Sequence, residues 1–71
     1  MITREEIDKL DGIGHYANDY EYHWGSWEYL YNSKNQTFWD INDGFGEPQL
    51  LVKKVKNLKH LEEILISLNL I

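Results

Sequence analysis

The chain contains no cysteine, and this absence excludes several kinds of chemistry. No disulfide, thiolate nucleophile or cysteine-ligated zinc site can form, and the chain has no need of an oxidising compartment. Its first residues lack the basic and then apolar pattern of a secretory signal, and no apolar run approaches the roughly 20 residues that span a bilayer. We therefore expect a cytoplasmic protein with no membrane partner.

The sequence also lacks the motifs that carry catalysis or bind nucleotides. Residues 12–15 (GIGH) are too short for a dinucleotide fingerprint or a phosphate-binding loop. Ser26 and Ser33 fall in predicted turns and Ser67 near the end of a predicted helix, so none has the setting of a nucleophile elbow. We expect a protein that is not an enzyme and binds no cofactor.

Basic residues are scarce in the first two thirds of the chain. Residues 1–48 carry three basic and ten acidic side chains, whereas residues 49–71 carry four lysines and two glutamates. An acidic surface repels phosphate and attracts basic partners, so the net charge of −5 argues against non-specific nucleic-acid binding. The local exception is a cluster of four lysines: Lys53, Lys54, Lys56 and Lys59.

Aromatic side chains are abundant, and all of them fall between Tyr16 and Phe45. In residues 20–31 (YEYHWGSWEYLY) they alternate around Gly25 and Ser26, which predicts a β-hairpin closed by a two-residue type II′ turn. That register puts six rings on one sheet face in three opposed pairs: Trp24 with Trp27, Tyr22 with Tyr29, and Tyr20 with Tyr31. The other face then carries Glu21, His23, Glu28 and Leu30.

Two further strands are predicted after the hairpin. Residues 32–36 (NSKNQ) fit a three-residue loop with Asn35 in the left-handed region, so that a third strand over 36–41 extends the ringed face with Thr37, Trp39 and Ile41. Residues 42–48 are rich in turn formers and predict a loop. Residues 49–55 are predicted as a fourth strand, with an early helix as the alternative because their apolar positions do not alternate.

Helices are predicted before and after the strands. Thr3 and Glu6 have the spacing of a capping box, which predicts a short helix ending near Asp11. Asn57 suits the N-cap of a final helix with one apolar stripe: Leu58, Leu61, Ile64, Leu65 and Leu68. Ile13 and Tyr16 are expected core anchors. The predicted fold is a single small α+β domain over residues 1–71, with an antiparallel three- to four-stranded aromatic meander and the C-terminal helix packed on one sheet face.

Patterns for metal binding are weak. Residues 40–44 (DINDG) resemble the start of a calcium loop, but Phe45 and Leu51 occupy positions where an EF-hand needs Gly and Glu. The predicted register aligns His23, Glu28 and Asp40 across three strands, which we interpret as a solvated polar face. The histidines have no ligand spacing, and we expect no metal site.

Elimination and charge favour non-catalytic protein binding. Acidic residues around an exposed ring suit a partner with a basic surface, because charge speeds encounter and a buried aromatic residue anchors the complex. The chain is small and rich in Asn, Lys, Ile and Tyr, which are encoded by AT-rich codons. Both features suit a phage or mobile-element gene, so we expect an inhibitor or modulator of that type. The candidate partner-binding residues are Glu21, Glu28, Asp40, Asp43, Phe45 and Glu47.

Two other hypotheses stay open from the sequence. A nucleic-acid-binding module would use the C-terminal lysine cluster, and a homo-oligomeric structural protein would pair through the 49–55 edge strand. Stacking of single-stranded nucleic acid on the rings is disfavoured, because Lys34 is the one Lys or Arg between Asp19 and Glu47.

Overall fold

The computed structural model describes residues 2–10, 14–41 and 46–71, which form two helices and five strands. The helices are α1 (Arg4–Asp8) and α2 (Leu58–Ser67). The strands are β1 (Gly14–Tyr16), β2 (Glu21–Trp24), β3 (Tyr29–Asn32), β4 (Thr37–Asp40) and β5 (Gln49–Val52). The predicted α+β class is confirmed. Along the chain, the strands of the meander sheet follow α1 and precede α2. The prediction for Ile13 lies outside the described residues.

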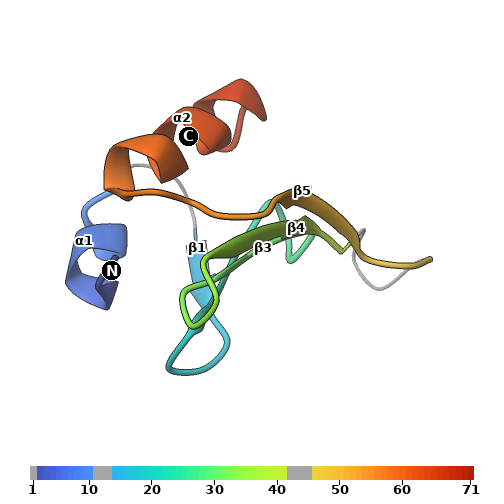
Figure 1. Ribbon diagram of the computed structural model, residues 1–71, viewed down its shortest axis with the longest axis horizontal. Coiled ribbons are helices and arrows are strands. Elements are labelled where there is room, and N and C mark those ends of the chain that lie inside the picture. The colour runs from blue at the N-terminus through green and yellow to red at the C-terminus, as the bar shows by residue number, and fades with distance from the viewer. Residues whose placement is uncertain (1, 11–13, 42–45) are drawn as a thin grey trace.

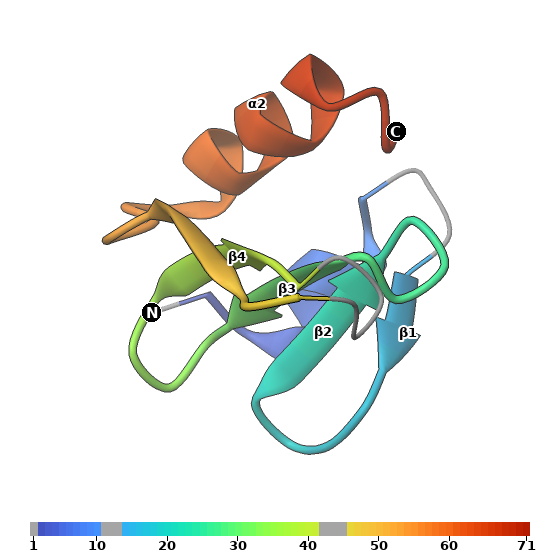
Figure 2. The same ribbon diagram turned by 90° about the vertical axis from the view of Figure 1, so that its right-hand side faces the viewer.

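The five strands form one antiparallel sheet in which each strand pairs with the next along the chain. Figures 1 and 2 show α2 lying over one face of this sheet, as predicted. The sheet has one strand more than the sequence predicted, because Gly14–Tyr16 pairs with β2. β5 is a strand rather than a helix, and it ends at Val52 instead of residue 55.

The hairpin of β2 and β3 forms, but its register differs from the predicted one by two residues. Trp24 pairs with Tyr29 and Tyr22 with Tyr31, because the turn has four residues, 25–28, rather than two. A shift of two residues keeps each side chain on its face, so these four rings still share one side of the sheet. Trp27 moves into the turn and leaves the predicted ladder.

Gly25 is required by this turn for two reasons. Its φ is +61°, a left-handed conformation that glycine adopts without a steric penalty. A Cβ atom at this position would also lie 3.0 Å from Cδ2 of Leu70 and 3.3 Å from Cδ2 of Tyr29. The next two residues, Ser26 and Trp27, also have positive φ values, of 55° and 71°. The predicted type II′ turn is therefore wrong, although the need for glycine at its first central position holds.

The predicted register between β3 and β4 is wrong by one residue. Tyr31 pairs with Phe38 and Leu30 with Trp39. Because successive side chains of a strand point to opposite faces, this shift exchanges the two aromatic residues of β4. Phe38 joins the ringed face and is fully buried, whereas Trp39 lies on the other face and is partly exposed.

The cause of this shift is the length of the connecting turn. The turn occupies residues 33–36, and its left-handed residue is Gln36, with a φ of 63°, rather than Asn35. The Asn32 side chain stabilises the turn, because its Oδ1 accepts hydrogen bonds from the backbone N–H groups of Lys34 and Asn35 at 2.9 and 3.4 Å. The loop therefore has four residues where the sequence predicted three.

The hydrophobic core lies between the ringed face and the helices. Phe38 is central, with its ring centroid 6.3 Å from that of Trp24 and 6.2 Å from that of Tyr29. The predicted stripe of α2 is confirmed, since Leu61 and Leu65 are fully buried and its other members pack against the core. The buried hydrophobic residues are Ile2, Ile7, Trp24, Tyr31, Phe38, Val55, Leu61 and Leu65.

Both helix starts have the predicted caps. Thr3 and Glu6 form the reciprocal hydrogen bonds of a capping box, and the Asn57 side chain accepts from the backbone N–H of His60 at 2.8 Å. The helix α1 is also tied to the sheet, because the hydroxyl of Tyr22 donates to Oδ1 of Asp8 at 2.9 Å. Local sequence signals therefore fix where both helices begin.

The outer strand β5 carries features that hinder pairing with another strand. Its register with β4 is irregular, since Leu50 pairs with Trp39 whereas Val52 pairs with Phe38, which leaves Leu51 as an extra residue. Pro48 precedes the strand, and the exposed Lys53 follows it. A bulge, a proline and a lysine are devices by which natural sheets protect an edge.

Candidate functional site

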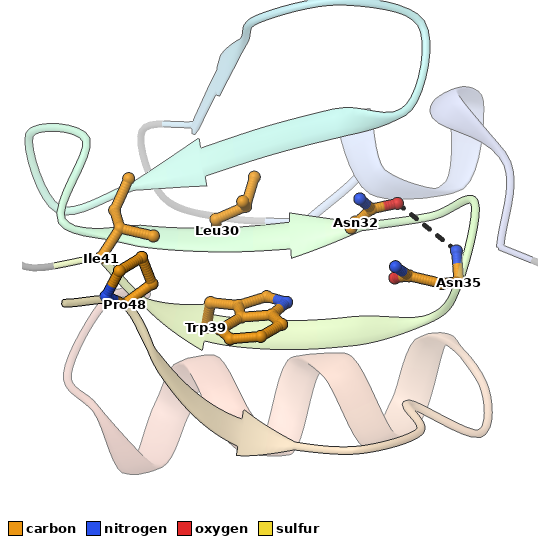
Figure 3. Close-up of a pocket in the computed structure, with 6 residues that line it drawn as sticks. All are labelled: Leu30, Asn32, Asn35, Trp39, Ile41 and Pro48. Atoms are coloured by element: carbon orange, nitrogen blue, oxygen red, sulfur yellow. Dashed lines mark hydrogen bonds between the residues drawn. The ribbon is translucent and has the colours of Figure 1, made fainter.

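One face of the sheet is covered by the helices, and the opposite face has neither helix over it. Figure 3 views this open face, with α2 behind the sheet. Leu30, Trp39 and Leu50 are neighbours across β3, β4 and β5 on it. Leu50 is 40% exposed. The open face is therefore largely apolar at its centre, where the sequence predicted a polar surface.

The predicted row of His23, Glu28 and Asp40 does not form. His23 pairs with Leu30 rather than with Glu28, which lies in the turn after β2. His23 is only 8% exposed, and its ring centroid lies 4.6 Å from that of Trp27. Trp27 itself is 42% exposed, so an indole rather than an imidazole meets solvent here.

A hollow of about 280 Å³ lies on the open face (Figure 3). We call it the Trp39 hollow, and its lining residues are Leu30, Asn32, Asn35, Trp39, Ile41 and Pro48. This volume is slightly below the range of about 300–1,000 Å³ that is usual for small-molecule pockets. It suits one or two side chains of a partner better than a whole cofactor.

A chain of hydrogen bonds fixes the indole of Trp39. Its Nε1–H donates to Oγ1 of Thr37 at 2.7 Å, and the Thr37 hydroxyl donates to Oδ1 of Asn35. The same Oδ1 accepts from the backbone N–H of Thr37 at 3.2 Å. Successive hydrogen bonds of this kind polarise and strengthen one another. The floor of the hollow is thus a ring held in one orientation.

The predicted partner-binding residues are only partly brought together. Glu28 and Glu47 lie toward one end of the sheet, because the backbone N–H of Ile41 donates to the Glu28 carbonyl at 2.9 Å and Glu47 directly precedes Pro48. Glu21 lies at the other end, paired with Asn32.

Asp40 pairs with Tyr29 and Gln49, and alternation places it on the helix-covered side rather than on the predicted polar face. Asp43 and Phe45 lie outside the described residues, as does most of the loop compared with calcium sites. Among the described residues, no three His, Asp or Glu side chains are arranged to hold a metal ion.

Burial raises the pKa of three tyrosines on the ringed face. For Tyr29, the nearby carboxylates of Glu28 and Asp40 add to the effect of burial. For Tyr22, the hydrogen bond to Asp8 does so. For Tyr31, burial alone raises the pKa. In each case the folded protein favours the neutral phenol.

Replacement of Tyr31 by phenylalanine is expected to stabilise the protein by about 1 kcal/mol, because a buried polar group without a partner costs about 1–3 kcal/mol. Its hydroxyl is fully buried and has no hydrogen-bond partner within residues 2–10, 14–41 and 46–71. Urea unfolding at pH 8 measures the change. The control is Tyr20→Phe, at a residue 40% exposed, which should change stability little. A loss of stability in Tyr31→Phe would contradict the orphaned hydroxyl.

The same variant is expected to lose less stability in alkali. The pKa of Tyr31 is raised above its ordinary value of 10.0, so above pH 10 the unfolded chain releases a proton that the folded chain keeps. Stability therefore falls as pH rises from 10 through the folded pKa, by at most about 1.4 kcal/mol per pH unit for each tyrosine. Unfolding at pH 8 and pH 11 should show a smaller difference in Tyr31→Phe than in the wild type.

Comparison of the chain with models of protein families, with curated proteins and with solved structures finds no match. In the described part of the chain, neither helix has the length and apolar character to cross a bilayer. The candidate site is therefore assigned from its geometry alone. The Trp39 hollow was not predicted from the sequence, because a one-residue shift of the β3–β4 register moves Trp39 to the other face. Leu30 was the one apolar residue on the face predicted to be polar.

Proposed function

We propose that the protein is a small, non-catalytic protein-binding module that acts as an inhibitor or modulator of a partner with a basic surface. The observation that carries this proposal is the Trp39 hollow on the open sheet face. Of its lining residues, Ile41 is hydrogen-bonded through the backbone to Glu28, and Pro48 directly follows the exposed Glu47. Apolar surface combined with a fixed ring and a charged rim is the usual composition of a binding site for another protein.

The exposed apolar residues on this face support a role in association. Leu50 is 40% exposed and Trp27 is 42% exposed, and the Trp39 hollow lies on the same face. Monomeric soluble proteins rarely expose large contiguous apolar patches. Where such a patch is bounded by polar residues, it marks an interaction site. Tryptophan is also one of the residue types enriched among those that dominate binding energy.

Charge indicates which kind of partner is suited to this face. Residues 1–48 carry ten acidic and three basic side chains. Such a surface attracts basic partners and speeds their encounter. A second copy of the chain would bring the same acidic residues, and the β5 edge through which two sheets could pair is protected. We propose a cytoplasmic site of action, consistent with the absence of cysteine, and a phage or mobile-element origin consistent with the composition.

Reversal of the acidic rim is expected to weaken partner binding about tenfold. The bait is the full-length chain on a resin, used to capture proteins from a bacterial lysate, and the captured partner is then purified for titration. The variant is the double substitution Glu28→Lys and Glu47→Lys. A matched control makes the same charge change on the exposed outer side of α2, with Glu62→Lys and Glu63→Lys. Loss of one or two favourable charge contacts accounts for a factor of that size.

The proposal would be contradicted if no partner were captured by the wild type, or if rim and control variants bound the partner equally. Salt-sensitive binding of an oligonucleotide that Lys53→Glu weakens would instead support the nucleic-acid hypothesis. A molecular mass above that of the monomer in light scattering would support self-association.

A further inference from the structure

The Trp39 hollow differs in chemistry between its two ends, and this difference narrows the class of ligand. This inference rests on the proposed function and specifies what the hollow binds. One end is formed by Asn32 and Asn35, from the end of β3 and the turn before β4. The other is formed by Ile41 and Pro48, beyond the end of β4 and before β5.

The asparagine end offers hydrogen-bond donors. Oδ1 of Asn32 accepts two backbone N–H groups, and Oδ1 of Asn35 accepts the backbone N–H and the hydroxyl of Thr37. Backbone N–H groups can only donate, so these contacts fix which side-chain atom is oxygen. Each oxygen thus has both lone pairs engaged. The two Nδ2 groups make no hydrogen bond within the described residues, and they remain as donors for a ligand.

Two charged residues near the asparagine end have partners outside the hollow. Glu21 is paired with Asn32, and its Oε1 accepts a hydrogen bond from Nδ2 of Asn18. Lys34 lies in the turn before β4, is exposed, and holds its Nζ 5.4 Å from the ring centroid of Tyr20. The two Nδ2 donors of Asn32 and Asn35 suit groups that accept hydrogen bonds, such as peptide carbonyls. These amide donors make no hydrogen bond with a lysine or arginine side chain, which has no acceptor.

The opposite end is acidic. Glu28 lies at the same end of the sheet as Ile41, because the backbone N–H of Ile41 donates to the Glu28 carbonyl at 2.9 Å. Glu47 directly precedes Pro48 and is exposed. Asn32 pairs with Thr37, and Ile41 lies four residues beyond Thr37, so at about 3.3 Å per residue the two ends are roughly 13 Å apart. That is the length of three to four residues of extended peptide.

We propose that the Trp39 hollow binds a short extended segment of the partner that carries one apolar residue beside a lysine or arginine. The apolar side chain packs on the Trp39 indole and Leu30. Backbone carbonyls of the segment accept hydrogen bonds from Nδ2 of Asn32 and Asn35, and the basic side chain reaches Glu28 and Glu47. Each end of the hollow then meets its chemical complement.

Other occupants match only part of this surface. A sugar could use the indole and the amide donors, but it carries no cation for the acidic end. A nucleic acid would bring phosphates against Glu28 and Glu47, which repel them. A second copy of the chain would place an acidic rim against this face. A basic peptide segment uses the apolar floor and both ends together.

The probe is a phage-displayed library of random heptapeptides, panned on the immobilised full-length chain with counter-selection on the bare surface. We expect the selected peptides to share an apolar residue next to Lys or Arg. A synthetic peptide of that sequence, added to ¹⁵N-labelled protein, should shift the Nε1–H signal of Trp39 and the amide signal of Leu30. The affinity should lie in the micromolar to millimolar range.

The donors are tested by Asn32→Asp and Asn35→Asp. Aspartate keeps the oxygen acceptors that stabilise the turn and removes the Nδ2 donors, so each variant should fold and should bind the selected peptide at least tenfold more weakly. The matched control is Asn69→Asp, the same change at an exposed residue beyond the end of α2. It should leave peptide affinity unchanged. Circular dichroism confirms that each variant is folded.

Three results would overturn this inference. These are no enrichment over the bare surface, basic peptides that shift signals of β5 or α2 instead of Trp39, and equal peptide binding by the asparagine and control variants. In each case the charge-dependent capture of a whole partner would still decide the proposed function separately. Enrichment of acidic peptides would count against both the inference and the proposed function.

Discussion

Replacement of Phe38 by alanine is expected to unfold most of the protein, whereas the same replacement of Trp39 should leave it folded. Phe38 has no exposed surface and packs between Trp24, Tyr29 and the helices. Truncation of a buried phenylalanine costs about 3–5 kcal/mol. A domain of this size rarely has more than about 3–5 kcal/mol of stability. The loss in Phe38→Ala is therefore about as large as the whole stability.

The measurement is urea unfolding followed by far-ultraviolet circular dichroism. For Trp39→Ala we expect a loss of about 1 kcal/mol, because the indole is partly exposed and its removal breaks one hydrogen bond, to Thr37. The pair tests the register of β3 and β4 directly. A larger loss in Trp39→Ala than in Phe38→Ala would mean that Trp39 points into the core, as the three-residue loop predicted.

Replacement of Leu65 by alanine is expected to cost about 2–5 kcal/mol and to leave α2 poorly held on the sheet. Leu65 has no exposed surface, and its carbonyl accepts from the backbone N–H of Leu70 at 2.8 Å. A helix of ten residues is too short to be stable alone in water, so it depends on packing of its apolar stripe. Loss of the buried Leu65 side chain should therefore reduce helix content as well as stability.

The control for this variant is Ile66→Ala, at the next position of the same helix. Ile66 is 54% exposed, and substitutions at such surface positions usually change stability by less than about 0.5 kcal/mol. Thermal unfolding of both variants gives the comparison. Similar losses for Leu65→Ala and Ile66→Ala would mean that α2 packs on the sheet through a different side.

Features specified by nearby residues were predictable from the sequence. The capping box at Thr3 and the N-cap at Asn57 depend on contacts within three residues, and both form as predicted. The stripe of α2 follows from helical spacing, which one helix repeats over its whole length. The central hairpin also forms around Gly25, where a positive φ favours glycine. These signals were strong because no distant residue competes with them.

The register of the sheet was harder to predict, because turn length decides it. The turn at 33–36 has one residue more than predicted, and that single residue exchanges Phe38 with Trp39. Both side chains are large and aromatic, so alternation in the sequence TFWD gives no reason to prefer one of them for the core. The turn after β2 was longer by two residues, which left the faces unchanged.

The prediction of the candidate site was wrong for the same reason. A polar face was predicted from the alignment of His23 with Glu28 and Asp40, and that alignment required the wrong register. In the structure Leu30 and Trp39 occupy the centre of the face, and Glu28 and Glu47 lie toward one end of the sheet. The strand Gly14–Tyr16 was also missed, because three residues are too few to show a period of two.

The order of the strands has a consequence for how the protein folds. Each strand pairs with the one that follows it in the chain, so every pairing closes a short loop and costs little chain entropy. Domains with such low contact order fold rapidly. The sheet can form by successive hairpins, and docking of the two helices then completes the core. The slower, long-range closures that delay many β proteins are confined to this final step.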